Sequence, residues 1–168
     1  MASRLGLTVE RVSIRPVGTA AGCTDIRSTA PSPTLSVIAA QVVGILAGRA
    51  ADTCLGAGPD AGAVTDLRQA TELVTAARAS FGLGGALRHR GAHGDHVRIL
   101  GLDADLADAV EADLKAALAE ATRRVEADAA AIRAIASALV RYQVLDGDAV
   151  RAILAAHPPS RPLRPFVV

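Results

Sequence analysis

The sequence predicts a mainly α-helical protein, a bundle of about four to five helices with a small N-terminal β-hairpin. Three observations support this fold class. Apolar residues recur at steps of three and four along much of the chain, the spacing of one buried helix face. Period-two alternation, which is typical of a strand, appears near the start. Hydrophobic residues make up 51% of the chain but aromatic residues only 2%, so the core must consist of Ala, Leu, Val and Ile.

The β-hairpin is expected within the first 26 residues. Residues 9–15 alternate apolar and polar side chains, and Pro16 and Gly18 then mark a turn. Residues 21–26 form a short return arm.

Two helices are expected next. The first runs from about Thr34 to Leu55, with Ser32 or Thr34 available as its N-cap and a stretch rich in Gly after it. The second runs over residues 65–80. Its apolar positions at steps of three and four are Leu67, Ala70, Leu73, Val74 and Ala77.

The second half of the chain predicts a loop and then more helix. Residues 84–101 are rich in Gly and His and indicate a mobile loop that ends in a short strand at 97–100. Asp103 opens a long amphipathic helix, with a break or bend near Asp128 before the helical pattern continues. Asp146 caps a last helix.

The length of the chain indicates how many domains it forms, and its charge indicates which classes of partner it binds. We expect a single domain over residues 1–157 and a Pro-rich tail over 158–168, because 168 residues can bury a sizeable core. Lys and Arg together number 18 against 17 Asp and Glu, a near balance that does not indicate a nucleic-acid partner.

The apolar run at 37–47 is broken by Gln41 and Gly44, so no membrane-spanning segment is expected. The N-terminus has no secretory signal pattern, and the two cysteines have no C-x-x-C spacing. These features predict reduced thiols and a cytoplasmic location.

Two motifs follow one another closely between residues 44 and 72. Residues 47–52 read A-G-R-A-A-D, and residues 62–71 read G-A-V-T-D-L-R-Q-A-T. They resemble G-G-R-A-A-E and G-A-x-N-D-L-x-x-A-T of the FtsH-type ATP-dependent zinc metalloproteases. The N-terminal hairpin and segment 136–150 also resemble family sequences, in the family's order, so that the resemblance covers roughly residues 9–156.

The resemblance implies the fold of the family's peptidase domain and makes Asp66 the third zinc ligand. A carboxylate oxygen is a normal partner for two imidazoles on zinc. Asp66 also has a purely structural interpretation, because a negative charge in the first turn of a helix stabilises it by some tenths of a kcal/mol. For Arg49 and Asp52 we favour structural roles, an ion pair with a nearby carboxylate and the end of a solvated helix face.

The metal site of the family also needs two histidines one helical turn apart and a Glu that polarises the metal-bound water. No H-E-x-x-H motif occurs in these 168 residues, and no histidine is followed by Glu. The ATP-binding pattern G-x-x-x-x-G-K-[ST] does not occur either. Zinc is therefore the cofactor implied by resemblance, but we expect this chain alone not to bind it, and no catalytic residue is assigned.

A local cluster of histidines suggests a second metal hypothesis. His89, His93 and His96, with Asp95 among them, could converge on zinc if their loop folded back. The intervening glycines supply no rigid element that would preorganise the ligands, so an exposed loop is the favoured interpretation.

Two functions fit these observations. In the first, the chain is a degenerate peptidase domain that has lost hydrolysis and serves interaction or assembly with protein partners. Because the family's peptidase domains form hexameric rings, the resemblance suggests a homo-oligomer or association with an active homologue. In the second, the chain is part of an active ATP-dependent zinc metalloendopeptidase that hydrolyses protein substrates and whose metal-binding helix and ATPase lie upstream.

Overall fold

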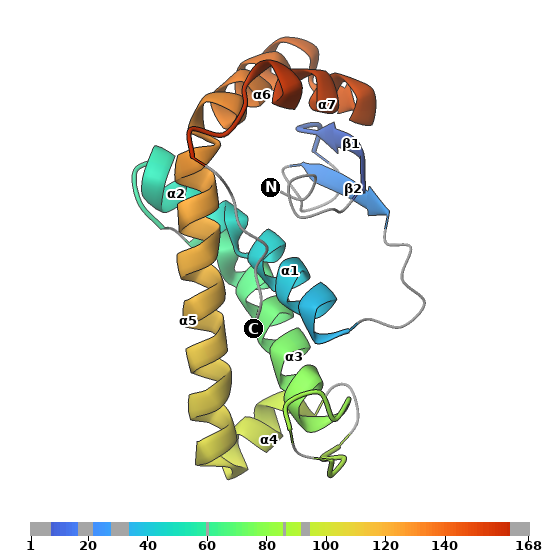
Figure 1. Ribbon diagram of the computed structural model, residues 1–168, viewed down its shortest axis with the longest axis vertical. Coiled ribbons are helices and arrows are strands. Elements are labelled where there is room, and N and C mark those ends of the chain that lie inside the picture. The colour runs from blue at the N-terminus through green and yellow to red at the C-terminus, as the bar shows by residue number, and fades with distance from the viewer. Residues whose placement is uncertain are drawn as a thin grey trace. The chain divides into compact units, whose positions relative to one another are not determined.

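The computed structural model describes residues 8–16, 22–27, 34–59, 61–85, 87–91 and 95–161. The chain is mainly helical with a small antiparallel sheet, which confirms the predicted fold class (Figure 1). Two compact units make up the structure. Unit 1 combines the described residues of Met1–Pro31 and Arg124–Pro165, and unit 2 those of Ser32–Arg123. The single domain expected over residues 1–157 stays a prediction.

The sheet of unit 1 has three strands in the order β2-β1-β3. The strands are β1 (Thr8–Ser13), β2 (Cys23–Arg27) and β3 (Val144–Asp146). β1 pairs antiparallel with both neighbours, so Val12 lies opposite Thr24 on one side and Leu145 on the other. The predicted antiparallel pairing of β1 and β2 is confirmed, and Gly18 of the expected turn lies outside the described residues. Sequence reasoning missed β3, because a strand of three residues has no periodicity of its own.

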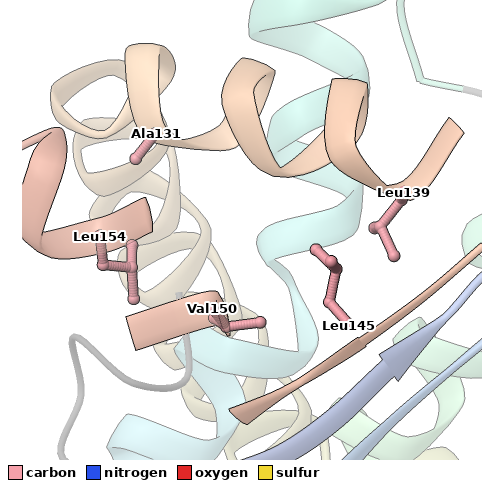
Figure 2. Packing of buried hydrophobic residues seen from close by; sticks show 5 residues of the cluster. All are labelled: Ala131, Leu139, Leu145, Val150 and Leu154. Atoms are coloured by element: carbon pink, nitrogen blue, oxygen red, sulfur yellow. The ribbon is translucent and has the colours of Figure 1, made fainter. Parts of the chain in front are cut away.

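Two helices complete unit 1, α6 (Ala129–Tyr142) and α7 (Gly147–Ala156). The apolar core of unit 1 consists of Ala131, Leu139, Leu145, Val150 and Leu154. Figure 2 shows these side chains pointing into the space between α6, α7 and β3. Both helices thus bury one face against the sheet, as amphipathic helices do.

The ends of α6 and α7 follow local rules. Gln143 ends α6 in the left-handed conformation at φ 62°, and its N–H donates to the carbonyl of Leu139 over 2.7 Å. Asp146 caps α7 as predicted, since its Oδ1 accepts a hydrogen bond of 2.8 Å from the N–H of Ala149. Gly147 lies so close to the carbonyl oxygen of Val9 that a Cβ there would overlap it.

Unit 2 is helical. It contains α1 (Leu35–Ile45), α2 (Ala47–Leu55), the 3₁₀ turn η2 (Ala61–Ala63), α3 (Val64–Ala79), α4 (His96–Leu102) and most of α5 (Ala104–Ala127). The predicted helix from 34 to 55 is confirmed, with an irregular residue at Leu46, and Thr34 is its N-cap through a 3.4 Å hydrogen bond from the N–H of Val37. The helix expected over 65–80 corresponds to α3.

The segment Leu35–Leu55 is long and apolar enough to cross a membrane by length and composition alone. A buried core helix meets the same criterion, and Ile38, Val42 and Val43 are at most 2% exposed within the protein. The expected absence of a membrane span stays a prediction.

The predicted strand at 97–100 is wrong, because these residues belong to α4. The N–H of Ile99 donates to the carbonyl of Asp95, and that of Asp103 donates to Ile99, over 2.9 and 3.1 Å. A run of four residues is too short for its periodicity to separate strand from helix. Within the preceding loop, the N–H of Arg90 donates to the carbonyl of Ala79 over 2.7 Å, which fastens this part of the loop to the end of α3.

The long helix and its break are confirmed. Asp103 precedes α5 and accepts a 3.0 Å hydrogen bond from the N–H of Leu106. α5 ends at Ala127 and α6 begins at Ala129, so the irregular residue is Asp128, where the sequence predicts it.

Candidate metal centre

The structure brings the two motifs of unit 2 together at Asp66. The first motif forms the N-terminal part of α2, and Asp66 lies in the first turn of α3, directly after η2. A Cβ added at Gly48 would lie 3.7 Å from Oδ2 of Asp66, so the carboxylate faces the backbone of α2. The Gly-rich loop between the helices is short enough to place Asp66 beside Gly48.

The Asp66 carboxylate does not require a glycine at position 48. The φ of Gly48 is negative, and the 3.7 Å separation is an ordinary van der Waals contact, so an alanine would fit at this position. Within the described part of the chain, the half-buried carboxylate of Asp66 makes no hydrogen bond and no ion pair. It therefore has lone pairs available to a ligand.

Arg49 and Asp52 have local backbone roles. The carbonyl of Arg49 accepts a 3.0 Å hydrogen bond from the hydroxyl of Thr53. The carbonyl of Asp52 accepts from the N–H groups of Gly56 and Gly58 over 3.2 and 3.1 Å, which ends α2. No ion pair joins Arg49 to a carboxylate among the residues for which the structure gives positions.

The histidines of the predicted cluster differ in solvent exposure. His89 is exposed and its Nδ1 lies 3.2 Å from the carbonyl of Ser80, whereas His96 begins α4 and is only 3% exposed. The interpretation of an exposed loop is therefore wrong for His96, and His93 lies outside the described residues. Across the described ranges, no group of three or more His, Cys, Asp or Glu side chains is arranged to hold a metal ion.

The donor set at Asp66 does not fit a zinc site by itself. Catalytic zinc sites use three protein ligands and keep a fourth position for water. The described residues contain no group of three or more His, Cys, Asp or Glu side chains that could hold a metal ion, at Asp66 or elsewhere.

The sequence model of peptidase family M41 matches residues 3–153. The chain belongs to peptidase family M41. This is the family of the FtsH peptidase domain, a family of zinc metalloproteases, and the resemblance drawn from the two motifs is confirmed. A search among curated proteins finds no match for the chain. In this member of the M41 family, Asp66 lies in the first turn of α3, directly after η2.

Sequence reasoning missed a second feature of unit 2, an ion pair between α3 and α5. The Nε and Nη2 atoms of Arg78 donate to the two carboxylate oxygens of Asp113 over 2.6 and 2.8 Å. The hydrogen bond to Asp113 raises the pKa of Arg78, although partial burial opposes this shift. The two residues are 35 positions apart, and no local pattern connects them.

Proposed function

We propose that this M41 domain, as the 168-residue chain, does not hydrolyse peptide bonds and acts as an interaction or assembly domain. One observation carries the proposal. The M41 sequence model matches residues 3–153, while the described residues contain no group of three or more His, Cys, Asp or Glu side chains that could hold a metal ion.

The chemistry of zinc supports this proposal. Hydrolysis requires a metal that lowers the pKa of bound water and a base that accepts its proton. One half-buried carboxylate alone offers too few ligands to hold zinc through purification. A folded scaffold without its metal retains surfaces for protein partners, which by resemblance would be further copies of the chain or an active homologue.

The test measures zinc content and proteolysis of the same preparation. We expect the purified chain to contain no stoichiometric zinc by elemental analysis and to leave casein intact on gels after incubation with zinc. Asp66→Asn serves as the matched variant and should behave identically in both assays. Stoichiometric zinc, or casein cleavage abolished by Asp66→Asn, would overturn the proposal.

The assembly role has its own test. Light scattering coupled to size exclusion should give a mass above that of the 17.1 kDa monomer, or the chain should co-purify with a co-expressed active M41 homologue. A strictly monomeric chain that captures no homologue would contradict assembly.

A second function is favoured by the surroundings of the Asp66 carboxylate. Because the Asp66 carboxylate makes no hydrogen bond or ion pair among the described residues, Asp66 would serve as one ligand of a zinc site completed by two histidines from residues outside this sequence. The domain would then be part of an ATP-dependent zinc metalloendopeptidase.

The reading frame upstream of Met1 separates the two functions. An upstream H-E-x-x-H would favour the protease, and a chain extended to include it should bind zinc. Asp66→Ala should abolish that binding, whereas Asp52→Ala should retain it. A stop codon directly upstream would favour the inactive domain.

A further inference from the structure

Unit 2 contains an apolar pocket that the metal hypothesis does not use. Its volume is about 310 Å³, within the range of about 300–1,000 Å³ that is typical of ligand sites. Its lining residues lie between positions 35 and 117, in α1, α3, α5 and the turn after α3, so the pocket belongs to unit 2 alone. Spaces between the helices of a bundle are common sites for small molecules.

The floor of the pocket is buried and aliphatic. Its side chains are at most 6% exposed and are those of Ile38, Ala39, Val42, Val74, Ala77 and Ala117. Because these side chains carry no polar atom, the floor favours a group that does not need hydrogen bonds. A hydrocarbon tail meets this requirement.

The volume of the pocket limits the length of such a tail. A cavity of about 150 Å³ with an apolar lining binds benzene, so a pocket of about twice that volume holds roughly twelve non-hydrogen atoms. An aliphatic tail of about eight carbons with a small head group matches this size.

The rim of the pocket is exposed and includes a charged pair. Arg78 and Asp113 line it with side chains that are 28% and 24% exposed, beside Gly84 and Ala116. Nε and Nη2 of Arg78 donate to Asp113, and these are the only hydrogen bonds of Arg78 to any residue that the structure describes. A guanidinium has five N–H donors, so Nη1 keeps both of its N–H groups for an acceptor on a ligand.

The charge of the rim selects the head group of the ligand. The carboxylate of Asp113 compensates the guanidinium of Arg78, so the pair has no net charge. A carboxylate on the ligand would be repelled by Asp113, and an ammonium group would be repelled by Arg78 and has no acceptor for its N–H groups. An uncharged carbonyl oxygen can accept a hydrogen bond from Nη1 without such repulsion.

We propose that the pocket between α1, α3 and α5 binds an aliphatic molecule of about eight carbons with an uncharged carbonyl head group. The tail contacts the aliphatic floor, and the carbonyl oxygen accepts a hydrogen bond from Nη1 of Arg78. An amide or an ester of a medium-chain fatty acid has this chemistry. The site goes beyond the proposed function and does not depend on it.

Isothermal titration calorimetry of the full chain with octanamide tests the site. We expect saturable binding of one molecule per chain, and several-fold weaker binding of butanamide, whose shorter tail leaves much of the floor uncovered. Octanoate and octylamine have tails of similar length with charged heads, and both should bind several-fold more weakly than octanamide. Lack of saturable octanamide binding, or equal binding of these compounds, would overturn the proposal.

Substitutions on α5 locate the bound molecule. Ala116→Leu places a larger side chain at the rim and should weaken octanamide binding several-fold. Ala119→Leu is the matched control, because Ala119 is also exposed on α5 but does not line the pocket, and it should leave the affinity unchanged. Ala39→Leu fills the floor and serves as a second pocket variant. Octanamide binding that survives both pocket variants would place the ligand elsewhere and refute the site.

Asp113→Asn tests the position of the head group. The variant leaves Arg78 without its anion, so the rim gains a net positive charge and octanoate should bind several-fold more tightly than it binds the wild type. Octanamide carries no charge, and its affinity should change little. An octanoate affinity equal to that of the wild type would show that the head group does not lie at Arg78 and would contradict the assignment.

Discussion

The guanidinium of Arg78 binds the carboxylate of Asp113 through two hydrogen bonds of 2.6 and 2.8 Å, and this pair joins α3 to α5 within unit 2. Both side chains are mostly buried, at 28% and 24% exposure, so solvent screens the pair less than a surface ion pair. Asp113→Asn leaves a charged donor without its anion. We expect a loss of about 1–3 kcal/mol in the free energy of unfolding, measured with urea.

An exposed pair on α3 provides the control. Arg68 and Glu72 are one turn apart at 3.1 Å, with side chains 66% and 41% exposed. Glu72→Gln should cost no more than about 0.5 kcal/mol. If Asp113→Asn and Glu72→Gln lower the free energy of unfolding equally, the Arg78–Asp113 pair stabilises the protein no more than an exposed pair does.

The same pair predicts how stability depends on pH. Because Asp113 raises the pKa of Arg78 above its unfolded value, the stabilisation is complete below the unfolded pKa and is lost only as pH rises through the folded one. Both values lie well above neutrality. The difference in unfolding free energy between wild type and Arg78→Leu should therefore not change as the pH rises from neutral to mildly alkaline, and a change over that interval would contradict the assignment.

Position 147 in unit 1 has no room for a side chain. A Cβ at this position would overlap the carbonyl oxygen of Val9, and backbone atoms cannot move aside as a flexible side chain can. Gly147→Ala should therefore cost about 1–3 kcal/mol through overpacking and lower the melting temperature. Gly101→Ala is the control, because nothing lies within 4 Å of its Cβ position in α4, and it should be neutral or slightly stabilising.

The N-cap of α7 predicts a smaller effect. Asp146→Ala removes the 2.8 Å hydrogen bond to the N–H of Ala149 and should lower the free energy of unfolding by about 0.5–2 kcal/mol. Asp148 lies in the first turn of the same helix but does not cap it. Asp148→Ala should cost only some tenths of a kcal/mol, and a larger loss for Asp148→Ala than for Asp146→Ala would contradict the assigned cap.

The surroundings of Asp66 predict that the folded chain does not depend on its carboxylate. Asp66→Asn should change the free energy of unfolding by at most about 1 kcal/mol, because only the helix dipole is affected. Gly48→Ala should stabilise α2 by up to about 1 kcal/mol, since a Cβ meets Oδ2 only at 3.7 Å. Thermal melts monitored by circular dichroism test both, and strong destabilisation by either variant would indicate a structural role for this pair.

Local rules made much of the fold predictable from the sequence. The hairpin, the helix caps at Thr34 and Asp146 and the break at Asp128 all depend on residues close to one another in the chain. The proximity of Gly48 and Asp66 was not predicted, because these residues belong to different helices and no local pattern connects them.

Features set by distant partners were missed. β3 exists because Leu145 pairs with Val12, and no pattern within its three residues indicates that. The Arg78–Asp113 pair and the pocket beside it depend on how α1, α3 and α5 pack, which periodicity does not determine.

Residues 97–100 form a helix rather than the strand expected from their apolar character, and His96 is buried despite its Gly-rich surroundings.

Unit 1 draws its strands from both ends of the chain, whereas the described part of unit 2 comes from one continuous stretch. During synthesis the helices of unit 2 are therefore made one after another and can pack as soon as they emerge from the ribosome. β1, in contrast, cannot pair with β3 until more than a hundred further residues have been made. Until then one edge of the N-terminal hairpin stays open to other chains. Completion of this sheet is consequently a late, long-range event, and we expect it to set the folding rate of the protein.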